Sequence, residues 1–132
     1  MEILWQKRFE TGHEAIDLQH HYFVDLIQRI HAELNDATSA EHQAHLVREL
    51  IKYADFHFTS EENLTRAAPH EAWLLHQERH AELLAESRYN AEKLKSGQMS
   101  ADDFIDFLYF WFIGHTLHED MQLIAALPKA TA

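Results

Sequence analysis

The chain contains no cysteine, only three glycines and only two prolines among its 132 residues. The absence of cysteine excludes disulfide bonds and thiolate metal ligands, and it is compatible with a reducing cytosol. The scarcity of glycine and proline leaves few positions for turns, while apolar residues recur at steps of three and four over long segments. These features together predict an all-α protein.

Positive charge and long apolar runs are also scarce. Eleven Lys and Arg face 22 Asp and Glu, so the net charge is −11 and nucleic acid is not an expected partner. The most apolar run, residues 107–114, is too short to span a bilayer, and residues 1–5 lack the basic and apolar regions of a secretory signal. We therefore expect a cytoplasmic protein that binds neither nucleic acid nor membrane, folded as a single domain over residues 1–132.

Four amphipathic helices are expected within about residues 16–128, after a non-helical arm at residues 1–15 that Trp5 and Phe9 pack onto them. The expected helices run from an N-cap near Asp17 to Asn35, from a capping box at Thr38 to about Ala67, from Pro69 to Gly97, and from Ser100 to Pro128. Short connections make neighbouring helices antiparallel, so the predicted architecture is an up-down-up-down four-helix bundle.

Polar residues interrupt the apolar stripe of every expected helix. The chain has 12 histidines, and several of them stand at positions where a core residue is due. The four stripes are Ile16, His20, Phe23, Ile27, Ile30 and Leu34; then Leu46, Leu50, Ala54 or Tyr53, His57, Glu61 and Leu64; then Trp73, His76, His80, Leu83 or Leu84, Ala91 and Leu94; and finally Phe104, Leu108, Trp111, His115, either His118 or Glu119, and Gln122.

These interruptions all fall at the same end of the predicted bundle. His20 lies near the start of its helix, His57 and Glu61 near the end of theirs, and the pair His76 and His80 near a start. His115 and its acidic neighbours lie near an end, so an antiparallel arrangement brings all four regions together. A buried glutamate is rare unless it is paired or binds a metal. Imidazoles and carboxylates without sulfur suit Fe, Mn or Zn, and two carboxylates suggest two bridged ions.

The same residues resemble those of the hemerythrin family, and within it the single-domain bacterial hemerythrins, over nearly the whole chain. The matching segments are residues 16–20 (IDLQH), 57–62 (HFTSEE), 76–80 (HQERH) and 111–115 (WFIGH), followed by Asp120. The resemblance implies a non-haem di-iron centre, oxo- or hydroxo-bridged, that binds O₂ reversibly for storage, delivery or sensing. By the same analogy, one iron is held by His76, His80 and His115, the other by His20 and His57 with an open position, and both are bridged by Glu61 and Asp120.

The acidic ligand on the fourth helix is a choice between two neighbours. Ordinary helix geometry favours Glu119, about 40° around the axis from His115, over Asp120, about 140° away. The resemblance favours Asp120, and a local π-bulge would bring residues five apart into line. We therefore expect Asp120 to be the ligand. The resemblance also assigns Phe112 and Thr116 to the wall of the O₂ pocket, at positions where Leu and Ile are common in the family.

Two other classes of function are possible for such a chain. One is a di-iron oxidase or peroxidase, or an iron-handling protein, and the other is a metal-free interaction bundle. Ferritin-like di-iron enzymes carry Glu-x-x-His on two helices. Here that pattern occurs only from Glu10 to His13, outside the expected helices, which disfavours the enzyme. The sequence names no partner protein.

Overall fold

The computed structural model describes residues 3–129. The first two residues of the predicted arm and the last three of the predicted domain lie outside that range. The elements follow one another as η1 (Lys7–Phe9), α1 (Glu14–Glu33), α2 (Ala40–Leu64), α3 (His70–Lys95), α4 (Ala101–His115), η2 (Thr116–Asp120) and α5 (Met121–Ala125). Within residues 3–129 there is no strand, which confirms the prediction of an all-α fold.

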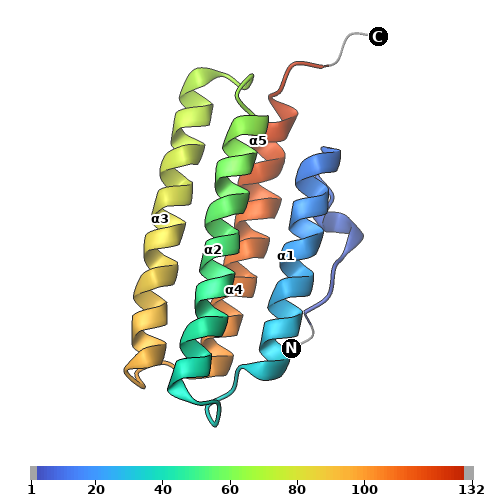
Figure 1. Cartoon of the computed structure of the whole chain (residues 1–132). Helices are drawn as coiled ribbons and strands as arrows, with labels where there is room; N and C mark the ends of the chain where they lie inside the picture. The colour runs from blue at the N-terminus through green and yellow to red at the C-terminus, as the bar shows by residue number, and fades with distance from the viewer. Residues whose placement is uncertain (1–2, 130–132) are drawn as a thin grey trace.

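Four long helical rods lie side by side and alternate in direction (Figure 1). The first three rods are α1, α2 and α3, and the fourth is the continuous run of α4, η2 and α5. The predicted up-down-up-down bundle is therefore confirmed. None of the helices in the described part of the chain combines the length and the apolarity needed to cross a membrane.

The apolar stripe of α1 lies in the core at every predicted position, from Ile16 to Leu34, and His20 is as completely buried as its apolar neighbours. On α2 the stripe is buried from Leu46 to Glu61. Leu64 is an exception, because it is 39% exposed in the last turn of the helix. Burial of these stripes is the main stabilising contribution, since it removes apolar surface from water.

Two predicted helix starts are wrong. Helix α1 begins at Glu14 with His13 as N-cap, and Asp17 lies inside its first turn. The Asp17 carboxylate instead accepts hydrogen bonds from the backbone N–H and the hydroxyl of Thr11, at 2.8 and 2.7 Å, and so ties the arm to the helix. The N-cap of α2 is Ser39, one residue after Thr38. The Thr38 hydroxyl is already engaged because it donates to the Glu33 carbonyl.

The other predicted helix boundaries lie within three residues of the observed ones. Helix α2 ends at Leu64, three residues before the predicted Ala67. Helix α3 ends at Lys95, after which Gly97 adopts a φ of 79°, which only glycine takes without strain, and the N–H of Gln98 donates to the Lys93 carbonyl. Ser100 caps α4 through its side chain, as predicted, by accepting from the N–H of Asp103.

The arm packs on the bundle as predicted, although its expected non-helical course includes the short 3₁₀ turn η1. Phe9 is fully buried, and its ring meets Trp5 edge-on at 5.5 Å between centroids. Phe9 also contacts Phe112 of α4 in the same edge-on manner at 5.9 Å. The arm therefore closes the bundle on the side of Phe112.

The stripe of the fourth rod shifts by one position after His115. The predicted continuation through His118 or Glu119 to Gln122 is wrong, because Asp120 and Leu123 are the buried residues and His118 and Gln122 are exposed. The cause is η2, whose backbone is a π-helix in which the N–H of Met121 donates to the carbonyl of Thr116, five residues back. One extra residue in the turn rotates everything that follows.

Candidate metal centre

The seven predicted ligand residues meet in the core at one end of the bundle. Each long helix contributes to the group, and each side chain is buried, with relative exposure between 0 and 7%. The contributing residues are His20 from α1, His57 and Glu61 from α2, His76 and His80 from α3, His115 at the end of α4, and Asp120 at the end of η2. The convergence predicted from the antiparallel order is therefore present in the structure.

The carboxylate of Glu61 points one oxygen to each of two sets of histidines. Its Oε1 lies 2.6 Å from Nε2 of His76 and 3.3 Å from Nε2 of His80. Its Oε2 lies 3.3 Å from Nε2 of His57 and 3.5 Å from Nε2 of His20. Glu61 therefore stands between two groups of imidazoles.

Asp120 is placed in the same way from the opposite helix. Its Oδ1 lies 2.8 Å from Nε2 of His115 and 2.9 Å from Nε2 of His76, and its Oδ2 lies 3.1 Å from Nε2 of His20. The cluster thus has a three-histidine half (His76, His80 and His115) and a two-histidine half (His20 and His57). Glu61 and Asp120 belong to both halves, and in each half the potential ligand atoms lie within 4.8 Å of one another.

The π-helical turn decides which acid of the fourth rod enters the cluster. In a regular α-helix Asp120 would lie about 140° around the axis from His115. The extra residue in η2 brings it onto the same side, where it is fully buried. Glu119 instead lies behind His115, where its carboxylate faces Nδ1 of that ring at 2.5 Å and accepts from Arg79 at 3.0 Å. π-Helical turns of this kind are frequent at functional sites.

A ring of acceptors outside the cluster orients three of the imidazoles. Nδ1 of His80 lies 2.8 Å from a carboxylate oxygen of Glu62, just as Nδ1 of His115 faces Glu119. Nδ1 of His57 lies 2.8 Å from Oε1 of Gln19, whose amide nitrogen donates to Ser60. Carboxylate and amide oxygens only accept, so Nδ1 carries the hydrogen in each ring. Each Nε2 is thereby the ring nitrogen that faces the cluster, where it can bind a metal once it carries no proton.

A metal ion fits the atoms that face each other across this cluster. Nε2 of His80 lies only 3.0 Å from Nε2 of His115. Glu61 Oε2, both carboxylate oxygens of Asp120 and both ring nitrogens of His20 are buried and make no hydrogen bond of regular geometry among the described residues, although the three oxygens lie close to imidazole nitrogens. Carboxylate oxygens and unprotonated imidazole nitrogens crowded in this way repel one another and are costly to desolvate unless protons or metal cations lie between them. Imidazole nitrogen and carboxylate oxygen are suitable ligands for iron.

In the absence of metal, the histidines and carboxyl groups of the cluster shift each other's pKa values. Burial opposes protonation of His20, His76 and His115, but the neighbouring carboxylates outweigh it and raise the pKa of each ring to about 9. Burial likewise opposes ionisation of Glu61 and Asp120, yet the surrounding histidines hold the pKa of both carboxyls well below their usual range. The cluster therefore attracts positive charge.

The His57 ring behaves differently from these three. Burial dominates there and lowers its pKa, although Glu61 acts in the opposite direction. Its Nε2 is therefore available without loss of a proton.

An aromatic wall covers the two-histidine half. The ring of Phe112 meets His20 edge-on at 5.4 Å and packs against Phe23 at 5.6 Å. Thr116, the other residue predicted to line an O₂ pocket, is fully buried, and its hydroxyl has no hydrogen-bond partner among residues 3–129. In the three-histidine half Phe58 stacks on His80, with 4.0 Å between the ring centroids.

The outer acceptors Gln19 and Glu62 were missed by reasoning from the sequence. Each is adjacent in sequence to a cluster residue, His20 or Glu61, and so lies about 100° away around its helix. No periodic pattern marks such positions. A polar residue beside a core histidine is a weak signal, because its target ring belongs to a different helix.

No family model matches the chain. It is 27% identical over 128 residues to a bacteriohemerythrin of Pseudomonas aeruginosa, a match that covers 95% of this chain and 81% of that protein. A bacteriohemerythrin of Stenotrophomonas maltophilia is 24% identical over 130 residues, covering 97% of this chain and 82% of the relative. A bacteriohemerythrin of Clostridium acetobutylicum is 22% identical over 127 residues, covering 92% and 98%.

Proposed function

Because this chain belongs to the bacterial hemerythrin family, we propose that it binds O₂ reversibly at a centre of two non-haem iron ions. The observation that carries the proposal is the placement of Glu61 and Asp120. Each carboxylate presents one oxygen to the three-histidine half and the other to the two-histidine half. A carboxylate with that orientation is suited to bridge two ions, one in each half.

The two halves would hold their ions with different numbers of ligands. The three-histidine half has three imidazoles and two shared carboxylates, and the two-histidine half has two imidazoles and the same carboxylates. The second set leaves a coordination position for a small ligand. When bound there, ferrous iron supplies the electrons with which O₂ can be held reversibly.

The protein's own side chains support binding rather than turnover of an organic substrate. The most exposed of the seven cluster residues retains only 7% of its accessible surface, so only a very small molecule can reach the site. Phe112 and its neighbours Phe9 and Phe23 keep water and protons away from the two-histidine half. We therefore propose a binding protein and not an oxidase or a peroxidase.

The decisive experiment measures iron content and optical spectra of the same sample. Protein produced with ample iron and kept anaerobic should contain two iron ions per chain. Its absorption spectrum should change on exposure to O₂ and return when O₂ is removed, over repeated cycles. One iron ion per chain, or none, would contradict the di-iron centre, and a single irreversible change would contradict reversible binding.

A further inference from the structure

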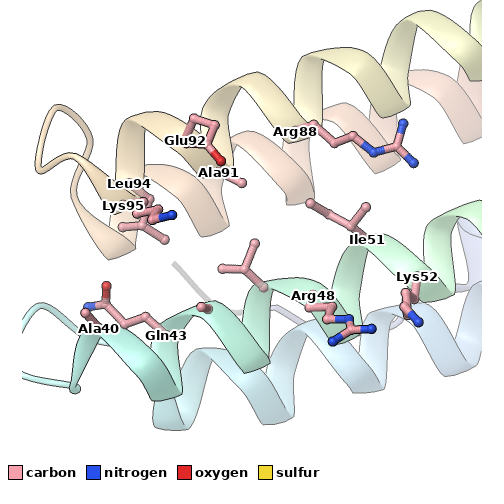
Figure 2. A pocket seen from close by; sticks show the side chains of 12 residues that line it. Ala40, Gln43, Arg48, Ile51, Lys52, Arg88, Ala91, Glu92, Leu94 and Lys95 are labelled. Atoms are coloured by element: carbon pink, nitrogen blue, oxygen red, sulfur yellow. The ribbon is translucent and has the colours of Figure 1, made fainter.

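A groove lies between α2 and α3, away from the metal cluster. Its lining comes from the part of α2 that precedes His57 and the part of α3 that follows His80 (Figure 2). The groove encloses about 500 Å³, which is within the range of sites for small organic molecules. It is hollow because Ala44 and Ala91 present only a methyl group where the two helices face each other.

The groove gathers positive charge in an otherwise acidic protein. Four of the chain's 11 basic residues line it, namely Arg48, Lys52, Arg88 and Lys95, and Glu92 is the only acidic residue in the lining. Within the described residues none of these four cations has a carboxylate within 4 Å. Among the described Lys and Arg side chains, only Arg29, with Glu49, and Arg79, with Glu82 and Glu119, have a carboxylate within 4 Å. Unpaired cations around an apolar floor are complementary to an anion with an apolar body.

The charges are not distributed evenly along the groove. Figure 2 shows Arg48, Lys52 and Arg88 towards one end, beside Ile51, and Lys95 towards the other end. The floor between the ends is formed by small and branched apolar side chains, among them Ala44, Val47, Ala91 and Leu94. One end therefore suits an anionic head group and the floor suits a hydrocarbon chain.

We propose that this groove binds a medium-chain fatty carboxylate. The carboxylate lies between Arg48 and Arg88, because a guanidinium group forms paired hydrogen bonds with a carboxylate. The hydrocarbon chain covers Val47 and Leu94. A second copy of this chain is a poor occupant, because two molecules of net charge −11 repel each other. The proposal is independent of the iron centre.

The test is a calorimetric titration of the full chain with dodecanoate below its micelle concentration. We expect one saturable site, and we expect no binding of dodecyltrimethylammonium, which has the same chain and a cationic head. Replacing both arginines, Arg48→Gln with Arg88→Gln, should weaken dodecanoate binding by about tenfold or more. The matched control removes two exposed charges elsewhere, Lys7→Gln with Lys129→Gln, and should bind like the parent chain.

A second pair of variants tests the floor of the groove. Ala91→Leu fills the groove and should also weaken binding by about tenfold or more, whereas Ala85→Leu, on the exposed face of the same helix, should not. Circular dichroism and iron content check that each variant folds. Equal binding of both detergents, equal effects of variant and control, or no saturable site would each overturn the proposal. It would also be overturned if the chain dimerised in sedimentation and Ala91→Leu abolished the dimer, or if a glutamate-rich helical peptide bound there and dodecanoate did not.

Discussion

The two halves of the metal cluster differ in what lies behind their imidazoles. In the three-histidine half, Nδ1 of His80 and of His115 donate to the carboxylates of Glu62 and Glu119. A carboxylate in that position makes the imidazole more basic and holds the ring in a fixed orientation. This half would therefore hold a bound ion firmly.

In the two-histidine half, Nδ1 of His57 donates to the neutral amide oxygen of Gln19, and Nδ1 of His20 has no hydrogen-bond partner among the described residues. Phe112 adds an apolar wall beside His20. With weaker support and fewer ligands, an ion bound in this half would react more readily with an incoming small molecule. One bundle would thus hold a firmly bound ion in the three-histidine half and a more reactive ion in the two-histidine half.

The largest predicted effect comes from removing a residue that both halves share. Asp120→Ala should reduce iron from two ions per chain to one or none, because the bridging oxygens disappear and His20 and His115 each lose a carboxylate contact. Iron analysis and the spectrum of the iron pair provide the measurement. Glu119→Ala is the control and should retain two ions after growth with ample iron. The opposite pattern would show that Glu119 is the ligand.

Replacing the hydrogen-bond acceptors behind His80 and His57 should bring the metal affinities of the two halves closer together. Glu62→Gln replaces the carboxylate behind His80 by an amide and should lower the metal affinity of the three-histidine half by about 10–100-fold. Gln19→Glu makes the reverse change behind His57 and should raise the affinity of the two-histidine half. Anaerobic competition with a chelator measures both affinities.

The matched control for this exchange is Glu78→Gln, which removes a carboxylate from the exposed face of α3. It should leave both affinities unchanged. If Glu62→Gln behaved like Glu78→Gln, the carboxylate behind His80 would have no influence on the metal.

Removing the aromatic side chain of Phe112 should change O₂ binding in the two-histidine half. Phe112→Ala should admit water beside His20 and shorten the lifetime of the O₂ complex several-fold, measured as the rate of loss of its absorption. The substitution should also destabilise the fold by about 3–5 kcal/mol, as is usual for a buried phenylalanine. Phe104→Ala removes an equally buried ring at the start of α4 and serves as the control for stability. Equal lifetimes in the two variants would show that Phe112 does not seal the pocket.

The smallest effect is a pH dependence of metal binding. His20, His76 and His115 have pKa values of about 9 without metal, so they are protonated at pH 7.5 and must release protons before they can bind. We expect up to about three protons released per chain at pH 7.5 and fewer above pH 9. The apparent affinity should accordingly rise with pH up to about 9.

Calorimetry in two buffers of different ionisation enthalpy measures the number of protons released. Ferrous iron under anaerobic conditions is the titrant. A number that did not change between pH 7.5 and pH 9.5 would show that the imidazoles are already neutral in the metal-free chain.

Much of the fold could be predicted because helices are specified by residues that lie close together in the sequence. The stripe from Ile16 to Leu34, the cap at Ser100 and the glycine at Gly97 each depend on residues close in sequence. The errors at Asp17 and Thr38 have one cause. Both side chains are good capping residues, but Asp17 instead accepts from Thr11 in the arm and Thr38 instead donates to the Glu33 carbonyl at the end of α1.

By itself, the sequence determined that four helices form, that their apolar stripes are interrupted at one end of the bundle, and which residue types meet there. Helical periodicity and the antiparallel order of short-linked helices are sufficient for that. The role of the seven cluster residues as iron ligands stays a prediction. The division into two halves and the choice of Asp120 were expected from the family resemblance and not from helical periodicity. Only the folded structure shows the π-helical turn that brings Asp120 into the cluster, and only there do Gln19 and Glu62 stand behind His57 and His80. These features depend on distances between side chains of different helices and on one altered backbone turn, which no local pattern in the sequence records.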